Sequence, residues 1–380
     1  MIDTSSTTFE NPRREIWIAL LGRQDKPVDG VDDYCTFLGR ALASRDIELK
    51  KCRVRWFERG RIRALRQLWR ERSEWRGKWV LVQYTALSWS LRGFPFYALF
   101  AVAILRRSGA RCVIVFHEPQ GVSESGKWVG RIRRASQNWV ARGLHLLGAG
   151  SIFADPLPTI PWLPENDPKA AFIPIGANIP EPRTKLDSSA SRNGARRTVA
   201  VFCLSDEPNV LLELHDIAVA AGKAATDSAE VRVLFIGRGT TNAEDTIAQV
   251  FRDVPVQVSN LGLLSAENVS NTLAECDAML YVRGKVCPNR GSAIAGIACG
   301  VPIVGYAGGV DGTPLAEAGL ALVPYRDAEA LGDALARVLS DPVYSRELRD
   351  RSVCAQRTYF SWDVISSAFI NFLRAPRNGA

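Results

Sequence analysis

The sequence predicts an α/β protein of two doubly wound domains, and three observations support this fold class. The chain has 380 residues, a length that suits two domains of about 150–200 residues. Hydrophobic residues make up 47% of it and charged residues 23%, which excludes a chain that is mainly disordered. Short apolar runs also alternate with segments of helical periodicity from end to end, the pattern of parallel strands buried on both faces.

Apolar runs of strand length fill both halves of the chain. Those of the first half are residues 15–21, 47–52, 79–83, 111–116, 151–153 and 171–174. Those of the second half are residues 199–204, 231–236, 256–259, 278–282, 302–305 and 321–323. Between the two sets lies segment 184–197, which is polar, rich in serine and without periodicity. We interpret it as the linker between a first domain, 1–183, and a second domain across a central cleft.

The positive charge of the chain is unevenly distributed. The net charge is +8, with 28 basic and 17 acidic side chains in residues 1–180 but 20 and 23 in residues 181–380. An acidic partner is therefore expected for the first half. Lys50–Lys78 alone holds twelve Lys and Arg and three acidic residues, interleaved with Trp and Phe. This segment is either a solvated amphipathic helix with aromatic residues toward the core or a patch for anionic lipid headgroups.

Cysteine usage and hydropathy indicate a cytoplasmic protein. The eight cysteines are scattered without a C-x-x-C pair, which argues against a metal site and against a disulfide framework. Residues 1–15 are polar and lack the apolar core of a signal peptide. The apolar stretch Phe94–Leu105 is too short to span a bilayer. It is expected to form either a buried helix or a helix at a membrane interface.

Ligands of open α/β sheets bind beyond the carboxyl ends of the strands, where loops lead into helices. In the loop 27–34, Gly30 would let a ligand approach the backbone, and Asp32 or Asp33 could cap the helix 34–45. A capped turn without a ligand explains the same residues. His117 and Glu118 directly follow the run 111–116, and either a functional or a structural role fits that histidine.

Two further segments of this kind lie in the second half. Gly237-Arg238-Gly239 follows a strand and is half of a dinucleotide fingerprint, a weak motif that still places backbone and Arg238 at a strand end. Near residue 290, Gly291 and Ser292 open a small-residue helix whose N–H groups and dipole favour an anion. Three cations surround this end and suit a pyrophosphate, although a solvated basic loop is the alternative. They are Arg283, Lys285 and Arg290.

These motifs, in this order and spacing, resemble the GT-B-fold glycosyltransferases of family 4 over nearly the whole chain. The matching segments are 30–34, His117, 173–178, 234–239, 260–264, 298–304 and 360–363. The resemblance implies two Rossmann-like domains, the second at 198–355, and a C-terminal helix in 356–380 that crosses back to the first domain. It places Leu263 and Leu264 at the nucleotide base, and His117 and Gly30 along the donor sugar and acceptor side.

The chain departs from this family at four positions that contact the donor. The two glutamates that the family carries eight positions apart in the donor helix correspond here to Cys287 and Ala295. The family's Arg and Lys after the first strand of the second domain are missing from segment 202–208. We expect the three cations near residue 290 to replace them. The Arg290-Gly291-Ser292 arrangement resembles a minority pattern among related bacterial transferases.

Two functions from different classes follow from this resemblance. The first is a hexosyltransferase that moves sugar from a nucleoside diphosphate sugar to a glycan or lipid-linked acceptor in polysaccharide or glycoconjugate assembly. The resemblance implies that it retains the anomeric configuration. The absence of an Asp-x-Asp motif suits a mechanism without a metal ion, and no cofactor is expected. The protein would be cytoplasmic or peripheral at the inner membrane face. The second is a catalytically inactive GT-B partner or regulatory subunit. Nucleic-acid binding is not expected, because the basic half contains no reader motif.

Overall fold

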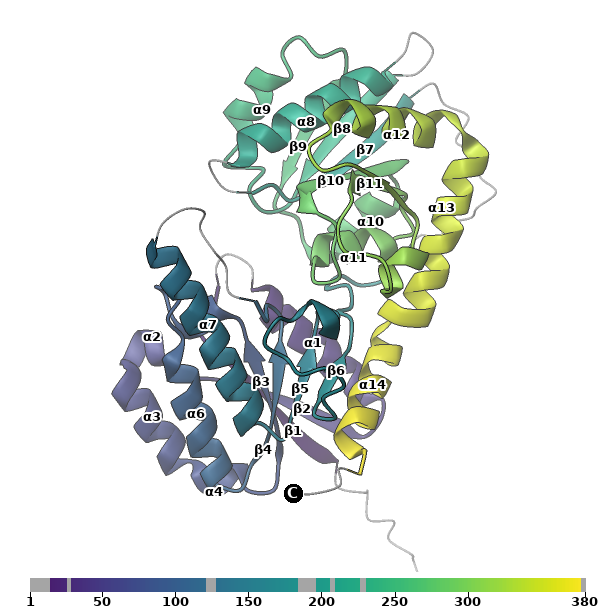
Figure 1. Cartoon of the computed structure of the whole chain (residues 1–380). Coiled ribbons are helices and arrows are strands. Elements are labelled where there is room, and N and C mark those ends of the chain that lie inside the picture. The colour runs from purple at the N-terminus through teal and green to yellow at the C-terminus, as the bar shows by residue number, and fades with distance from the viewer. Residues whose placement is uncertain are drawn as a thin grey trace, which may run out of the picture. The chain divides into compact units, whose positions relative to one another are not determined.

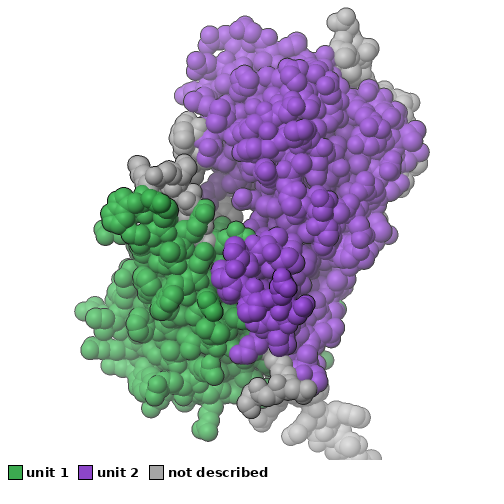
Figure 2. Space-filling view, viewed as in Figure 1, with its two compact units in different colours: residues 1–152 green, residues 153–380 purple. Residues whose placement is uncertain are grey.

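The computed structural model describes residues 14–25, 29–120, 128–183, 196–205, 209–225 and 230–376. Contacts divide the chain into two compact units, residues 1–152 and 153–380 (Figure 2). Ala177 and Ile179, which lie within the predicted first domain 1–183, pack in a core of the second unit. Of the predicted linker 184–197, residues 184–195 lie outside the described residues, and Arg196 and Arg197 begin the first strand of the second sheet.

The first sheet has the strand order β2-β1-β3-β4-β5-β6 (Figure 1). The recorded pairings of β1 with β2 and β3, and of β3 with β4, are parallel. The order reverses between β1 and β3, which makes their carboxyl ends a topological switch point. The strands are β1 (Glu15–Leu21), β2 (Ile47–Arg53), β3 (Trp79–Tyr84), β4 (Arg111–Phe116), β5 (Gly150–Phe153) and β6 (Ala170–Phe172).

The second sheet has the order β12-β11-β10-β7-β8-β9, again with parallel pairings. Its switch point lies between β10 and β7. Val199 and Ala200 are neighbours in β7 but belong to different buried clusters, so this sheet is covered on both faces. The strands are β7 (Arg196–Phe202), β8 (Glu230–Ile236), β9 (Gln257–Gly262), β10 (Ala278–Lys285), β11 (Ile303–Tyr306) and β12 (Leu320–Val323).

Every apolar run predicted as a strand overlaps one of these strands, and the predicted class of two doubly wound α/β sheets is confirmed. These strands could be predicted from the sequence because both of their faces are buried, so that nearly all of their residues are apolar. In β4, for example, every residue after Arg111 is buried.

The helices of the first unit include an apolar one, α6, whose two faces differ. Tyr97, Ala101 and Leu105 are buried, whereas Phe96 and Phe100 are exposed. The expected helix within Phe94–Leu105 is therefore present, and only one of its faces is covered. The helices are α1 (Gly30–Ala43), α2 (Trp56–Arg59), α3 (Arg61–Arg70), α4 (Arg72–Trp75), α5 (Ala86–Trp89), α6 (Phe96–Arg107) and α7 (Trp128–Leu147).

The second unit ends in two consecutive helices separated by a π-helical turn. Ser361 caps the last helix by accepting a hydrogen bond from the Val364 N–H at 3.3 Å, and Trp362 donates from Nε1 to the Ala177 carbonyl at 2.8 Å. The helical segments are η1 (Leu157–Thr159), α8 (Asn209–Ala224), α9 (Glu244–Val250), α10 (Ala266–Ala274), α11 (Gly291–Ala298), η2 (Pro314–Glu317), α12 (Ala328–Ser340), α13 (Pro342–Ala355), η3 (Gln356–Phe360) and α14 (Trp362–Arg374). Across the described ranges, no helix is both long enough and apolar enough to traverse a bilayer.

Candidate functional site

The N-terminus of α11 lies beside the switch point of the second sheet and is open. Arg290 occupies the N-cap position, and within the described part of the chain no side chain caps this helix. A Cβ added to Gly291 would meet nothing within 4 Å. The rest of the helix is anchored by buried Ile294 and Ile297. The first-turn N–H groups and the positive end of the helix dipole are therefore placed to bind an anion.

Tyr281, a buried residue in the middle of β10, lies close to two of the predicted cations. Burial raises the pKa of Tyr281 to about 12, while the positive charges of Arg290 and Arg283 oppose this shift. Both guanidinium groups therefore lie close enough to the Tyr281 phenol to lower its pKa. The Arg283 Nε atom is buried and has no hydrogen-bond partner among the described residues. A buried donor of this kind costs free energy unless an acceptor reaches it, and a bound anion would supply one.

The carboxyl end of β7 connects Arg283 to a third predicted cation. Burial raises the pKa of the Cys203 thiol, and the backbone of Arg238 and the charges of Arg283 and Arg238 oppose the shift. The Leu204 N–H donates to the Arg238 carbonyl at 3.0 Å. Since β7 lies between β10 and β8, the structure brings Arg238, Arg283 and Arg290 to one sheet edge.

Lys285, the remaining predicted cation, is directed elsewhere. Its Nζ atom lies 5.4 Å from the centre of the Tyr325 ring, and Arg326 stands 5.6 Å from the same ring. This cation–π contact engages Lys285 on the side of the sheet where β11 and β12 lie. The expected cluster of Arg283, Lys285 and Arg290 therefore forms around Tyr281 with only its two arginines.

The glycines of the Gly-x-Gly turn serve packing. Gly237 has φ +92° and Gly239 has φ +85°. A Cβ on Gly237 would lie 2.9 Å from Cys203 Sγ, and one on Gly239 would lie 2.6 Å from the Leu204 carbonyl oxygen. The turn presses against the segment after β7, which fixes where the Arg238 backbone lies.

The two leucines predicted to contact a nucleotide base differ in exposure. Both follow β9 in the short loop before α10. Leu263 is exposed, whereas Leu264 is partly buried against a core of the second unit. Only Leu263 therefore presents most of its side chain to a ligand.

One contact of this site has no signal in the sequence. Asn289 donates from Nδ2 to Asp155 Oδ2 at 3.3 Å and accepts from Cys287 Sγ at 3.1 Å. Burial raises the pKa of Cys287, with Asp155 adding to the shift and Arg290 opposing it, so the thiol retains its proton for this bond. Asp155 lies 134 positions from Asn289 in sequence, and no local pattern links them.

Ala295, at the position of a family glutamate, is buried in α11 and packs in a core of the second unit. A second acidic residue that the sequence did not single out is Glu213 of α8. Its side chain is buried and accepts a hydrogen bond from the Ser205 N–H at 2.9 Å. Its negative charge contributes to the raised pKa of Tyr281. Its apolar neighbours in sequence gave no signal of this position.

In the first unit, His117 directly follows β4. Its Nε2 lies 2.8 Å from Gln83 Oε1, and its ring meets Tyr34 edge-on at 4.9 Å. Burial lowers the pKa of His117 to about 4, so the imidazole is neutral at pH 7. Because Oε1 can only accept, Nε2 carries the hydrogen and Nδ1 is the basic nitrogen. Glu118 is exposed beside it.

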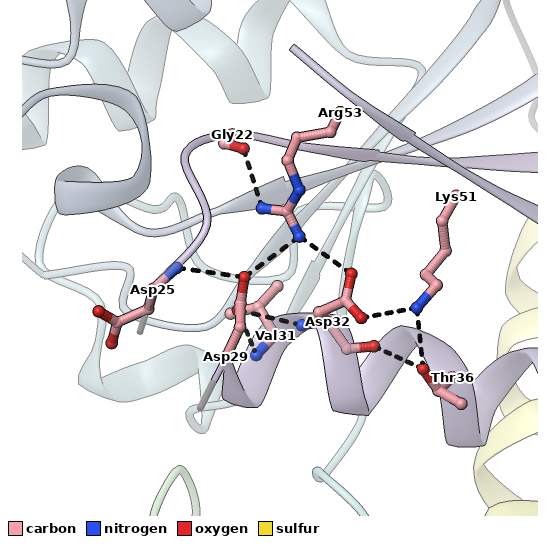
Figure 3. Close-up of polar contacts among 8 residues, drawn as sticks. All are labelled: Gly22, Asp25, Asp29, Val31, Asp32, Thr36, Lys51 and Arg53. Atoms are coloured by element: carbon pink, nitrogen blue, oxygen red, sulfur yellow. Dashed lines mark hydrogen bonds and ion pairs between the residues drawn. The ribbon is translucent and has the colours of Figure 1, made fainter. Parts of the chain in front are cut away.

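In the predicted loop 27–34, residues 27 and 28 lie outside the described residues, and acidic residues of the remainder make contacts that hold the start of α1 (Figure 3). The helix α1 begins at Gly30, four residues earlier than expected, because Asp29 accepts from the N–H groups of Val31 and Asp32 at 3.2 Å. The prediction that Asp32 or Asp33 caps this helix is therefore wrong. Asp32 instead pairs with Lys51 at 2.6 Å and with Arg53 at 2.9 Å. Arg53 also binds Asp29 at 3.2 Å.

Comparisons with known proteins define the class of fold. The structure superposes on sucrose-phosphate synthase of Thermosynechococcus elongatus with a TM-score of 0.67 at 16% identity, covering 95% of this chain and 98% of that one. It superposes on Anabaena HepE in complex with UDP and glucose with a TM-score of 0.66 at 14% identity, covering 94% and 98%. It superposes on a glycosyltransferase of Rickettsia africae with a TM-score of 0.63 at 10% identity, covering 96% of this chain and 100% of that one. The chain therefore has the GT-B fold, as its sequence motifs predicted.

Sequence similarity adds one curated relative. Over 224 residues the chain is 25% identical to a GDP-mannose-dependent monoacylated alpha-(1-6)-phosphatidylinositol monomannoside mannosyltransferase of Corynebacterium glutamicum. The aligned part is 56% of this chain and spans just over half, 58%, of that protein. No family model matches the chain.

Proposed function

We propose that the protein is a hexosyltransferase that uses a nucleoside diphosphate sugar as its donor. The observation that carries this proposal is the convergence of Arg238, Arg283 and Arg290 with the uncapped N-terminus of α11. The corynebacterial relative is named for its use of GDP-mannose, and HepE binds UDP-glucose in a solved complex. Both are consistent with a diphosphate at this sheet edge.

In the proposed reaction, charge builds up on the departing diphosphate as the bond to the sugar breaks. The α11 N–H groups, Arg283 and Arg290 would stabilise that charge in the transition state without a metal ion or cofactor. Leu263 would contact the base, Gly237 and Arg238 would border the phosphates, and Ser292 would add a hydroxyl at the helix end. Retention of the anomeric configuration is part of the proposal through the family resemblance alone.

His117, Glu118 and Gly30 are proposed to serve the donor sugar and the acceptor. The neutral imidazole of His117 offers Nδ1 as an acceptor for a sugar hydroxyl, while the hydrogen bond to Gln83 holds the ring. We propose a glycan or a lipid-linked acceptor in polysaccharide or glycoconjugate assembly. The protein would act in the cytoplasm or at the inner membrane face, where Lys50–Lys78 would meet anionic lipid.

Inactivity is the second candidate function, and the buried Ala295 favours it. A ribose-binding carboxylate at this position is absent, and the thiol of Cys287 stands where the other family glutamate would be. A protein with this site could bind nucleotide and act as the partner of an active transferase. Transfer or hydrolysis of a nucleotide sugar by the purified protein, abolished by His117→Ala, would exclude this alternative.

The test of the proposed site is calorimetric titration with UDP and GDP. Arg290→Ala should weaken binding of the preferred diphosphate by about tenfold or more, because a charge-assisted contact is lost. Arg346→Ala, which removes an exposed arginine of α13, is the matched control and should leave the affinity unchanged. Equal affinity of wild type and Arg290→Ala for every nucleoside diphosphate would overturn the phosphate assignment.

A further inference from the structure

Three helices of the first unit, α3, α6 and α7, form a layer in which α6 packs against both neighbours. They lie side by side in Figure 1. Each buries a face: Ala64 and Leu68 in α3, Ala101 in α6, and Val140 and Leu144 in α7 are all covered. The opposite faces carry large apolar side chains that remain exposed, which is unusual for the surface of a soluble domain.

The exposed apolar residues of α7 form one narrow stripe. Trp128 is 66% exposed, Trp139 is 62% and Leu146 is 61%, and Ile132 is exposed as well. At 3.6 residues per turn, these positions fall within roughly 40° of one another around the helix axis. Twenty residues of helix thus present a continuous apolar ridge to solvent.

The neighbouring helices extend this ridge sideways. Phe96 and Phe100 lie one turn apart on α6, and the Phe96 ring contacts the Trp139 ring with centroids 5.9 Å apart. On α3, Ile62 and Trp69 are exposed, whereas Ala64 and Leu68 are buried. The apolar patch therefore crosses the boundary between α6 and α7, and α3 adds exposed apolar residues on the third helix of the layer. Its exposed aromatic residues contact one another across the α6–α7 boundary.

The charge on these helices has one sign. Four arginines lie on α3, two on α6 and four on α7, and the three sequences contain no Asp or Glu. On α7, Arg131 and Arg142 fall within roughly 60° of the apolar stripe, and both are exposed. Aromatic side chains flanked by arginines suit the boundary between lipid headgroups and acyl chains.

We propose that the outer face of α3, α6 and α7, which we term the three-helix face, docks on an anionic lipid bilayer. Phe100, Trp128 and Trp139 would enter the interface, and exposed arginines such as Arg131 and Arg142 would meet the phosphate groups. A second copy of the chain suits this face poorly, because a twofold contact would oppose two arginine-rich surfaces. Nucleic acid would neutralise the arginines but leave Ile132 and Leu146 uncovered.

This proposal rests on the membrane contact included in the proposed function. It assigns that contact mainly to α6 and α7 and no longer to the whole segment Lys50–Lys78. Part of the earlier segment is already engaged inside the unit. Lys51 and Arg53 pair with acidic residues of α1, and Trp56 and Trp75 are buried. From that segment, α3 contributes to the three-helix face.

Vesicle sedimentation with the full-length chain tests the three-helix face. Vesicles of phosphatidylcholine mixed with phosphatidylglycerol should bind wild type, and pure phosphatidylcholine should bind it much more weakly. The double variant Phe100→Ser/Trp139→Ser should bind the anionic vesicles about tenfold more weakly, because the interfacial apolar area is lost. Leu212→Ser, which changes an equally exposed apolar residue of α8, is the matched control and should bind as wild type does.

Equal binding of the double variant and wild type, or equal binding of neutral and anionic vesicles, would overturn the proposal. So would dimerisation of wild type that the double variant abolishes, because the face would then be an interface between copies. Stronger competition by single-stranded DNA than by anionic lipid would assign the face to nucleic acid. Titration of the same variants with nucleotide distinguishes a failure of this proposal from a failure of the proposed nucleotide site, because neither variant should change nucleotide affinity.

Discussion

The N-termini of α1 and α11 each follow the carboxyl end of a strand, one in each sheet. They differ in the charge of the residue at the N-cap position, which is acidic in α1 and basic in α11. In α1, Asp29 caps the first turn, and Asp29 and Asp32 neutralise Arg53 and Lys51 (Figure 3). In α11, an arginine occupies the N-cap position, and the first turn contains no acidic residue. Both helices have the positive end of the helix dipole at the N-terminus. The availability of that dipole to a ligand therefore depends on whether the sequence supplies its own carboxylate.

This contrast explains why basic residues in the two sheets have different roles. The cations of β2 hold the start of α1 in place and are partly buried in doing so. Arg238, Arg283 and Arg290 instead oppose the upward shift that burial causes in the pKa of Tyr281 or Cys203, and the buried Nε atom of Arg283 has no hydrogen-bond partner among the described residues. A high count of arginines is thus weaker evidence for an anion site than the presence or absence of a carboxylate that caps the neighbouring helix.

Arg290→Asp is expected to have the largest effect, because it gives α11 the N-cap that α1 has. The carboxylate would occupy the helix end and repel a diphosphate, so nucleotide affinity should fall by about a hundredfold or more. Calorimetry measures the affinity, and thermal unfolding should show a midpoint no lower than that of wild type, since Asp is a favourable cap. Retained nucleotide binding would mean that the ligand does not use this helix end.

Asp29→Ala removes the corresponding cap from α1 and should destabilise the protein by about 1–2 kcal/mol. The variant loses both first-turn hydrogen bonds and one partner of Arg53. Denaturant unfolding measures the loss. Asp29→Asn, which can still cap, should recover part of it, and nucleotide affinity should be unchanged in both variants. A nucleotide-binding defect as large as that of Arg290→Ala would remove the proposed difference between the two helix ends.

His117 gives a smaller effect that depends on pH. Burial lowers the pKa of His117 to about 4, so the unfolded chain, with a histidine pKa near 6.5, binds more protons in this range. Stability should therefore fall as the pH is lowered from about 6.5 to about 4. His117→Gln should flatten this part of the stability curve measured by chemical denaturation, whereas the exposed His215→Gln should leave it unchanged. An equal slope in wild type and His117→Gln would contradict the lowered pKa of His117.

The sequence was sufficient to predict the strands and the convergence of Arg283 and Arg290, but not that Lys285 lies apart from them and Arg238 joins them. Buried parallel strands such as β4 consist of unbroken apolar runs, and Arg238 and Arg283 each follow such a run. The helix starts were harder to predict, because Asp29, Asp32 and Asp33 are all chemically capable caps. The backbone geometry at Asp29 decides among them.

Two features could not be predicted because they depend on packing between distant segments. The Asp155–Asn289 hydrogen bond joins residues with no shared motif. The exposure of Phe100 depends on α6 being covered on one face only, and an all-apolar sequence carries no periodicity that would reveal the open face.

The measurement that tests the central claim most directly is titration of wild type and Arg283→Ala with a nucleoside diphosphate and with the matching nucleoside. If Arg283 and the α11 N-terminus form the diphosphate site, wild type will bind the diphosphate much more tightly than the nucleoside. Arg283→Ala will lose most of that difference while its affinity for the nucleoside is unchanged. Equal affinity of wild type for the two ligands, or a preference for the diphosphate that survives Arg283→Ala, would contradict the assignment.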